Sequence, residues 1–122
     1  MKIVIIGSGN IGQAIANGFI RSEKIFPTDI IMTRKNTKLL TDYRDKGCYV
    51  TSDNGEAVEQ GEIIIVAVRP KQLEHLFQQI KSRLDEKRHI IVSIVTSVTC
   101  EEIRAMTGKN MEVVRIMPNT AI

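Results

Sequence analysis

The sequence has 122 residues and a formal net charge of +3, from 17 lysine and arginine residues and 14 aspartate and glutamate residues. With 43% hydrophobic and 25% charged residues, its composition is that of one globular domain and excludes a disordered, collagen-like or coiled-coil chain. A chain of this length buries enough surface for one core. The modest charge and the few aromatic residues argue against a nucleic-acid partner.

The longest unbroken apolar stretch, Ile63 to Val68, is far shorter than the roughly 20 residues that a membrane helix needs. The N-terminal apolar run stops at a glycine and has no signal-peptide pattern after it. Cys48 and Cys100 lack a CxxC or metal-ligand spacing, so we expect two reduced thiols and no metal. These features predict a soluble, cytoplasmic protein without a membrane partner.

In the first half of the chain, apolar runs alternate with segments of helical spacing. Ile3 to Ile6 and Ile30 to Met32 are apolar without alternation, as strands buried on both faces of a parallel sheet are. Asn36 to Lys46 is predicted as a helix closed by a glycine, and Tyr49 to Thr51 as a short strand. The first helix has an apolar stripe made of Ile11, Ala14, Ile15, Gly18 and Phe19.

The second half continues the same alternation. Strands are predicted at Ile63 to Val68, Ile90 to Val95 and Val113 to Met117. Pro70 can start the helix between the first two, because its missing N–H costs nothing there. A capping box predicts a short helix from Thr99 to Met106. The stripe of the helix after Pro70 consists of Leu73, Leu76, Phe77, Ile80 and Leu84.

The segment from Gly7 to Gly12 has the pattern GxGxxG directly after the first predicted strand and at the start of the first predicted helix. This is the context of the dinucleotide fingerprint. Its first glycine permits a tight turn, its second lets a pyrophosphate approach the backbone, and its third lets helix and strand pack closely. The predicted cofactor contacts in this loop are Gly7, Ser8, Gly9, Asn10, Ile11 and Gly12.

Strands alternating with helices, together with this glycine loop, predict an α/β fold. We expect a Rossmann-type, doubly wound, mainly parallel sheet with helices on both faces. Residues 1–122 are expected to form a single dinucleotide-binding domain.

About twenty residues after the glycine loop, an NAD-preferring domain places an acidic residue at the end of the second strand. This chain has Thr33, Arg34 and Lys35 there. A hydroxyl and two cations suit a 2′-phosphate through charge-assisted hydrogen bonds, so we expect NADP(H) to be favoured over NAD(H). The alternative is that Arg34 and Lys35 are solvated loop charges.

Other loops fall at the carboxyl ends of strands, where ligands of open α/β sheets bind. Asn54 follows the third strand and is either a helix cap or a cofactor contact. The loops after the fourth and fifth strands are placed to line the nicotinamide half of a cofactor, although Arg69 is equally consistent with an exposed loop charge. The contacts predicted in these two loops are Ala67, Val68, Arg69, Pro70, Ile94, Val95 and Thr96.

The titratable residues show no catalytic constellation of their own. His75 and His89 are expected on the surface, and no Ser/His/Asp set, carboxylate pair or metal cluster is visible. This suits hydride transfer, which needs positioning around a cofactor more than a protein nucleophile.

Four segments together resemble pyrroline-5-carboxylate reductase, over the whole length of the chain: Ile6 to Gly12, Ala67 to Pro70, Ile91 to Ile94 and Val114 to Thr120. The last of these, with Arg-x-Met-Pro-Asn-Thr, is the most specific. The resemblance implies NADPH-dependent reduction of the small-molecule imine L-1-pyrroline-5-carboxylate to L-proline. It places the glycine loop, the strand ends named above and Asn54 at the cofactor, and Asn119 near the nicotinamide and the substrate.

Two features depart from that family. Members usually have Ala-Ala-Gly where this chain has Val95, Thr96 and Ser97. They also continue into a helical domain that forms a homo-oligomer and supplies much of the substrate site, so we expect this chain to be the N-terminal part of a longer enzyme that binds cofactor and turns over poorly alone. The alternatives are another small NADP reductase, acting on a carbonyl or a deazaflavin, and a non-catalytic NADP(H)-binding regulatory paralogue.

Overall fold

The computed structural model describes residues 1–117 and shows one six-stranded sheet in which every strand pair is parallel. The central strand pairs along its whole length with the two strands beside it, so that Ile6 lies opposite Thr33 on one side and Val66 on the other. The strands are β1 (Ile3–Ile6), β2 (Ile30–Thr33), β3 (Tyr49–Thr51), β4 (Ile63–Val66), β5 (Ile90–Ser93) and β6 (Glu112–Arg115). Their spatial order is β3-β2-β1-β4-β5-β6.

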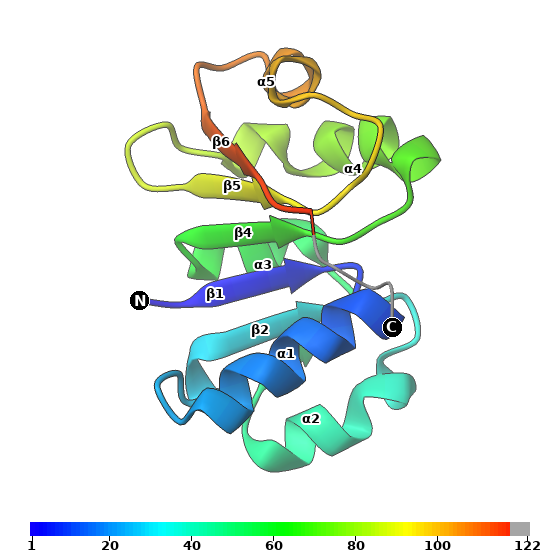
Figure 1. The fold of residues 1–122 in the computed structure, drawn as a ribbon, viewed down its shortest axis with the longest axis vertical. Coiled ribbons are helices and arrows are strands. Elements are labelled where there is room, and N and C mark those ends of the chain that lie inside the picture. The colour runs from blue at the N-terminus through cyan, green and yellow to red at the C-terminus, as the bar shows by residue number, and fades with distance from the viewer. Residues whose placement is uncertain (118–122) are drawn as a thin grey trace.

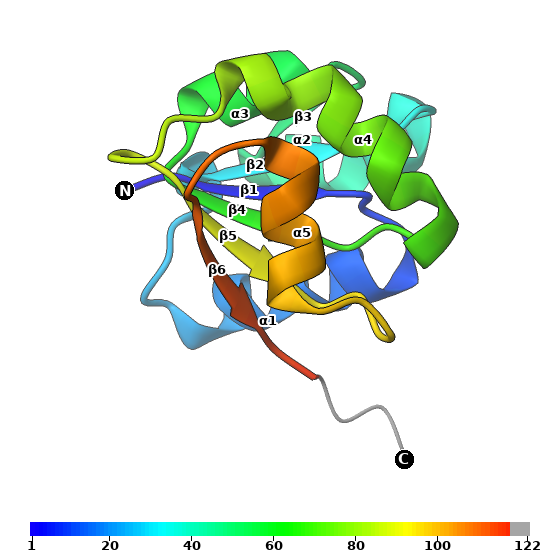
Figure 2. The ribbon, with the colours of Figure 1, turned by 90° about the horizontal axis from the view of Figure 1, so that it is seen from above.

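Helices cover both faces of this sheet (Figures 1 and 2). The helices are α1 (Asn10–Ser22), α2 (Thr41–Lys46), α3 (Asn54–Gln60), α4 (Leu73–Ile80) and α5 (Cys100–Thr107). The α1 and α2 helices lie on one face, and α3, α4 and α5 lie on the other. This strand order with helices on both faces is the Rossmann fold, so the predicted fold class is confirmed.

The alternation of side chains along the strands divides the core into two layers. Val4, Ile6 and Ile64 point toward Phe77 of α4 and Ile103 of α5 and are fully buried there. Their neighbours along the same strands point to the opposite layer, where they pack against α1 and α2; this layer contains Ile5, Met32, Ala16, Leu40 and Tyr43. A strand buried on both faces has to be apolar at consecutive positions, which explains the unbroken runs in the sequence.

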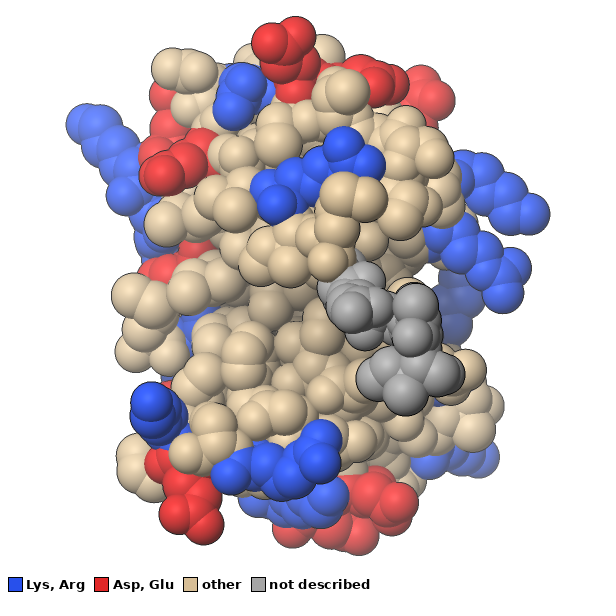
Figure 3. All heavy atoms as spheres, viewed as in Figure 1, with Lys and Arg blue, Asp and Glu red and all other residues tan. Residues whose placement is uncertain are grey.

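The α1 face is covered over only half of the sheet. In Figure 1 the strands β4, β5 and β6 have no described helix in front of them, and Figure 3 shows mainly uncharged surface across the middle of this face. Val113 of β6 is buried under α5, whereas its neighbour Val114 points the other way and is 42% exposed. Ile90 and Ile116 are exposed by 37% and 49%.

Several predicted elements end earlier than the apolar runs suggest. The apolar runs extend to Val68, Val95 and Met117, but the strands β4, β5 and β6 end at Val66, Ser93 and Arg115. One backbone hydrogen bond follows each strand end; after β4, the Ala67 N–H donates to the Ile6 carbonyl at 2.9 Å. Beyond that point the chain turns away. After β5 the turn residues Ile94 and Val95 are themselves buried, so the apolar run continues past the strand, whereas Ile116 and Met117 after β6 are apolar but exposed.

The segment Asn36 to Lys46 is not one helix, as predicted, but a 3₁₀ turn over Thr37–Leu40 followed by α2. The Asn36 side chain caps the 3₁₀ turn by accepting the Lys38 N–H at 3.2 Å. The backbone departs from helical angles at Leu40, with φ −112° and ψ 19°, so that its side chain is buried. Gly47, at φ +111°, ends α2 as expected.

The predicted helix after Pro70 and the predicted helix from Thr99 to Met106 also differ in detail from the structure. The helix after Pro70 is a 3₁₀ turn over Pro70–Gln72, then α4, then a second 3₁₀ turn over Lys81–Arg83. The α5 helix has the predicted capping box between Thr99 and Glu102 and ends one residue later than predicted. A further 3₁₀ turn, over Pro27–Asp29, precedes β2. Within residues 1–117, the structure has no helix with both the length and the apolarity to span a membrane.

The surface position predicted for His89 is wrong, whereas His75 is exposed as predicted. His89 is 1% exposed and joins two segments that are distant in sequence. Its Nδ1 accepts the Asp85 N–H at 2.9 Å, and its Nε2 lies 2.9 Å from the Val58 carbonyl, to which it donates. An imidazole that accepts at one nitrogen and donates at the other is neutral. Burial lowers the pKa of His89 below its ordinary value of 6.5.

This buried neutral histidine predicts a specific pH dependence of stability. Because the pKa of His89 is lower in the folded than in the unfolded chain, the unfolded chain binds more protons between the two values. The free energy of unfolding should therefore fall as the pH drops below about 6.5, with a His89 contribution of at most about 1.4 kcal/mol per pH unit. Urea titrations between pH 8 and pH 5 measure it.

The matched variants are His89→Gln and His75→Gln. The first should remove this contribution to the slope, and the second, which changes an exposed side chain, should retain the slope of the parent. Equal slopes in all three proteins would contradict a neutral, buried His89.

Candidate functional site

Because all six strands are parallel, the loops at their carboxyl ends meet along one edge of the sheet. The glycine loop lies at the centre of this edge, between the central strand β1 and the start of α1. The loops after β2 and β4 flank it on either side, because these two strands are the neighbours of β1.

The three glycines of the loop meet different surroundings. Gly7 has φ +84°, and a Cβ there would lie 2.7 Å from the Val68 side chain and 2.9 Å from the Ala67 carbonyl oxygen. A Cβ on Gly12 would lie 2.9 Å from the Gly7 carbonyl oxygen and 3.2 Å from the side chain of Ile5. Both positions therefore require glycine for packing. A Cβ on Gly9 would have no protein atom within 4 Å, so the space in front of this residue is open.

The start of α1 presents backbone donors toward this open space. The Gln13 N–H makes the first helical bond, to the Gly9 carbonyl at 2.9 Å. The N–H groups of Asn10, Ile11 and Gly12 precede it and have no partner within the helix. No side chain caps this end of the 13-residue helix, and its first turn holds no acidic residue. Such an end favours an anion, because the helix dipole is positive there.

Residues at and just after the end of β2 form hydrogen bonds with the glycine loop. The Thr33 hydroxyl accepts the Gly7 N–H at 3.3 Å, and the Thr33 carbonyl accepts the Ser8 N–H at 2.8 Å. Arg34 Nη1 then donates to the Ser8 carbonyl at 3.3 Å. Thr33 is 1% exposed, whereas Arg34 is half-buried and Lys35 is exposed. Arg34 therefore lies against the glycine loop, and the Thr33 hydroxyl already accepts a hydrogen bond within the protein.

Two residues of this loop have roles that the sequence did not indicate. The Ser8 side chain, predicted as a cofactor contact, is fully buried and donates to the Ile5 carbonyl at 3.2 Å. Gln13 shares the Ser8 carbonyl with Arg34, donating through Nε2 at 3.0 Å. The GxGxxG pattern ends at Gly12, one residue before Gln13, so no sequence motif pointed to Gln13.

The loops after β4 and β5 hold the remaining predicted contacts. Ala67 and Val68 are half-buried against Gly7, while Arg69 and Pro70 are exposed. After β5, Ile94 and Val95 are buried, and Thr96 is exposed at the edge.

The Val95-Thr96-Ser97 departure from the resembling family has a clear backbone signature. Val95 points into the core beneath α4 and α5, so its extra bulk relative to alanine is taken up there. Ser97 has φ +68°, in the left-handed region that glycine adopts most readily. The loop thus keeps a glycine-like conformation without a glycine.

Asn54 is not the cap of α3, which corrects one of its two predicted roles. Asp53 is the cap, because its carboxylate accepts the Glu56 N–H at 3.1 Å. The Asp-x-x-Glu spacing was a sequence signal for this. Asn54 is the first residue of α3 and donates to the Gln79 side chain at 3.2 Å. It lies at the same edge of the sheet, in a hollow of about 430 Å³.

Three further predictions concern Asn119, the two cysteines and the absence of a metal site. Asn119 lies outside the described residues. Cys48 and Cys100 are free, and burial raises the pKa of the Cys48 thiol, which keeps it protonated. Residues 1–117 contain no group of three or more histidine, cysteine, aspartate or glutamate side chains able to hold a metal ion.

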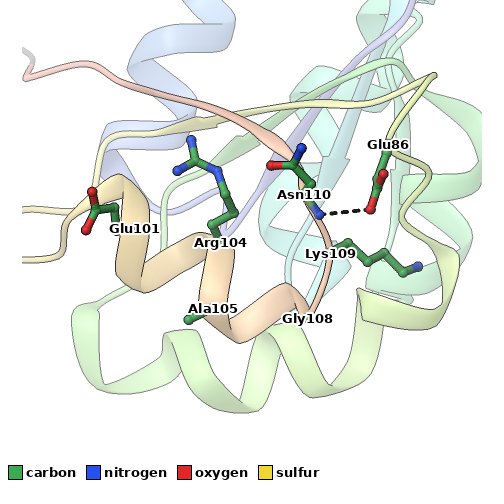
Figure 4. A pocket seen from close by; sticks show the side chains of 7 residues that line it. All are labelled: Glu86, Glu101, Arg104, Ala105, Gly108, Lys109 and Asn110. Carbon is green, nitrogen blue, oxygen red and sulfur yellow. Dashed lines mark hydrogen bonds between the residues drawn. The ribbon is translucent and has the colours of Figure 1, made fainter.

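A larger hollow, of about 640 Å³, lies along α5 and the turn before β6, away from the glycine loop (Figure 4). Three of its charged residues, Glu86, Arg104 and Lys109, bond backbone groups of the fold. Lys109 Nζ donates to the carbonyls of Lys81 and Leu84, both at 2.6 Å. Arg104 Nε donates to the Met111 carbonyl, and Glu86 accepts the Asn110 N–H. We therefore place the candidate site at the glycine loop.

Several known proteins are similar to this chain in sequence and in fold. Pyrroline-5-carboxylate reductase 1 of Dictyostelium discoideum is 38% identical over 98% of this chain and 22% of its own length. Pyrroline-5-carboxylate reductase 2 of the same organism is 39% identical over 99% of this chain and 41% of its own length. The solved structure of a pyrroline-5-carboxylate reductase from Coxiella burnetii superposes with a TM-score of 0.89 at 28% identity, covering 98% of this chain and 44% of that one. The chain thus spans less than half the length of these relatives.

The strand order and the glycine loop between β1 and α1 define a Rossmann-type α/β domain. Within that class, residues 2–97 match the family described as NADP oxidoreductase, coenzyme F420-dependent. The chain belongs to this family.

The different surroundings of Gly12 and Gly9 predict different tolerance to a methyl group. Gly12→Ala forces a Cβ against backbone and should lower the free energy of unfolding by about 1–3 kcal/mol. Gly9→Ala places its Cβ in open space at a negative φ and should change stability by less than about 1 kcal/mol. Urea denaturation of the two variants checks this order. A Gly9→Ala protein less stable than Gly12→Ala would show that the loop geometry is wrong.

Proposed function

We propose that residues 1–122 form the NADP(H)-binding domain of a pyrroline-5-carboxylate reductase. The observation that carries the proposal is the pairing, at one edge of the sheet, of free helix N–H groups with an open space at Gly9 and a cation at Arg34. The family description names NADP, and the relatives reported above carry the name pyrroline-5-carboxylate reductase.

The pyrophosphate would bind at the start of α1. The N–H groups of Asn10, Ile11 and Gly12 would donate to its oxygens, and the missing side chain of Gly9 leaves room for its approach. Gly7 and Gly12 support this by letting the loop turn between β1, α1 and the Ala67 carbonyl. Ser8 contributes indirectly by anchoring the loop, since its side chain is buried and its N–H and carbonyl are bonded to Thr33, Arg34 and Gln13.

The adenosine ribose would lie toward the end of β2. Arg34 is held against the loop by the Ser8 carbonyl and can offer its remaining N–H groups to a 2′-phosphate. Lys35, the next residue, is an exposed second cation. Residues 30–35 include no carboxylate that would accept hydrogen bonds from a free ribose 2′-hydroxyl. This arrangement favours NADP(H) over NAD(H). Asn54, at the neighbouring loop, would add an amide contact.

The nicotinamide would lie toward the loops after β4 and β5. Val68, Arg69, Pro70 and Thr96 reach the surface there, while Ile94 and Val95 support the loop from the core. When bound, reduced nicotinamide supplies a hydride to the C=N carbon of L-1-pyrroline-5-carboxylate, whose protonated nitrogen becomes the amine of L-proline. The chain's own residues contribute by binding and orienting. Asn119 is assigned to the substrate side.

The relatives are more than twice as long as the segment they share with this chain. We assign to such a further region the remainder of the substrate site and the formation of a homo-oligomer. A cytoplasmic location fits this assignment, since proline formation from a small soluble imine needs no membrane.

A second candidate is hydride exchange with coenzyme F420, a deazaflavin, because the family description names that coenzyme. The family match ends at residue 97, whereas similarity to the reductases extends over 98% of the chain or more and so takes in most of β6 and the segment beyond. This longer similarity favours the imine reductase.

Replacement of Arg34 tests the cofactor assignment. Arg34→Ala removes the guanidinium that would bind the 2′-phosphate, so NADPH affinity should fall by about 10- to 100-fold and NADH affinity by less than about 3-fold. Isothermal titration of both nucleotides measures this. Arg21→Ala, which removes an exposed cation at the far end of α1, should change neither affinity. Equal losses for NADPH and NADH with Arg34→Ala would sink the 2′-phosphate assignment.

A reduction assay tests the reaction. The chain, and the longer product if its gene encodes one, is supplied with NADPH and L-1-pyrroline-5-carboxylate, and proline formation is followed together with NADPH oxidation. We expect the longer product to turn over at least about tenfold faster than the chain alone, because orientation of the imine needs surfaces on both sides of the nicotinamide. NADPH oxidation by oxidised coenzyme F420 and none by the imine would instead establish the second candidate.

A further inference from the structure

The last residue of β2, Thr33, makes two hydrogen bonds to consecutive residues of the glycine loop. Its hydroxyl accepts the Gly7 N–H at 3.3 Å, and its carbonyl accepts the Ser8 N–H at 2.8 Å. The parallel register places Thr33 directly beside Ile6, the last residue before the loop. One residue of the neighbouring strand therefore holds the first turn of the loop through both its side chain and its backbone.

The next residue along the chain, Arg34, is also hydrogen-bonded to the glycine loop. Arg34 Nη1 donates to the Ser8 carbonyl at 3.3 Å, and the Arg34 N–H donates to the Thr51 carbonyl of β3 at 3.3 Å. The peptide groups around Ser8 are thus bonded to the last residue of β2, through N–H, and to the residue that follows it, through C=O. A shift of the loop relative to β2 would break these bonds together.

Burial separates the roles of these two neighbours. Thr33 is 1% exposed, and its hydroxyl already has a partner inside the protein. Among the described residues, every buried side-chain nitrogen or oxygen has at least one hydrogen-bond partner. The burial of Thr33 places this hydroxyl beneath the surface at which a nucleotide phosphate would bind. Arg34 is half-buried and retains free N–H groups.

We propose that Thr33 is a positioning residue for the glycine loop and takes no part in distinguishing NADPH from NADH. By holding Gly7 through its hydroxyl and Ser8 through its carbonyl, Thr33 sets where the N–H groups at the start of α1 point, and these groups meet the pyrophosphate that both nucleotides share. Arg34 alone of the pair acts on the 2′-phosphate. This inference rests on the proposed function, and it assigns to Thr33 a role different from the direct phosphate contact expected from the sequence.

The test compares Thr33→Val with Thr33→Ser. Valine has the shape of threonine and suits a strand, but it leaves the Gly7 N–H without its acceptor, whereas serine keeps the hydroxyl. Each variant is titrated with NADPH and with NADH at a temperature where circular dichroism shows it folded. With Thr33→Val, both affinities should fall by the same factor, about 3- to 10-fold, and their ratio should stay that of the parent. With Thr33→Ser, both should stay within about twofold of the parent.

Three results would overturn the proposal. A loss confined to NADPH would make Thr33 a direct 2′-phosphate contact, and unchanged affinities in a destabilised Thr33→Val protein would make its role purely structural. A Thr33→Ser protein as weak as Thr33→Val would show that the hydroxyl is not what matters. If Thr33→Val does not fold, Thr33→Ala removes the same hydroxyl and is judged by the same outcomes. A parent protein that is folded and binds neither nucleotide would refute the proposed function itself, which is a separate result.

Discussion

The close approach of α1 to β1 at the glycine loop is the constraint on which the rest of the structure depends. The chain leaves the central strand of the sheet through Gly7 at φ +84°, and the first turn of α1 passes so near that a Cβ on Gly12 would lie 2.9 Å from the Gly7 carbonyl oxygen. Since β1 pairs with both β2 and β4, this turn decides how α1 lies on the sheet and which loops adjoin its first residues. A bulkier turn would separate helix from sheet and open the α1 layer of the core.

Residues at this edge of the sheet differ in burial, and burial decides which of them can contact a molecule in solvent. Thr33 and Ser8 look like polar ligand contacts in the sequence, yet both side chains are enclosed and satisfied within the protein. Arg34 follows directly and remains accessible. The difference arises at the end of β2, where Thr33 is still paired beside β1 and Arg34 has already left the strand. The accessible cation is thus held by a buried frame of hydrogen bonds.

Most of the fold could be predicted from the sequence, and its deviations have physical causes. Unbroken apolar runs located five of the six strands, because a parallel sheet covered on both faces needs them, but the same runs overestimated the strand ends after β4, β5 and β6. His89 was misplaced because the atoms that satisfy it, the Asp85 N–H and the Val58 carbonyl, are backbone groups, one of them 31 residues away. Asp53 was missed as a cap although its spacing to Glu56 signalled it.

The sequence by itself determined the α/β class, the glycine loop and the cations at the end of β2, because these depend on local patterns: periodicity, the absence of Cβ atoms, and charge at a fixed spacing. Only the tertiary structure decided which of the neighbouring residues reach solvent. Thr33 is enclosed because β2 pairs with β1 and meets the glycine loop, and Arg34 lies over Ser8 because the two are brought together across 26 residues of chain. Burial and long-range hydrogen bonding arise when distant segments pack together, so no local pattern specifies them.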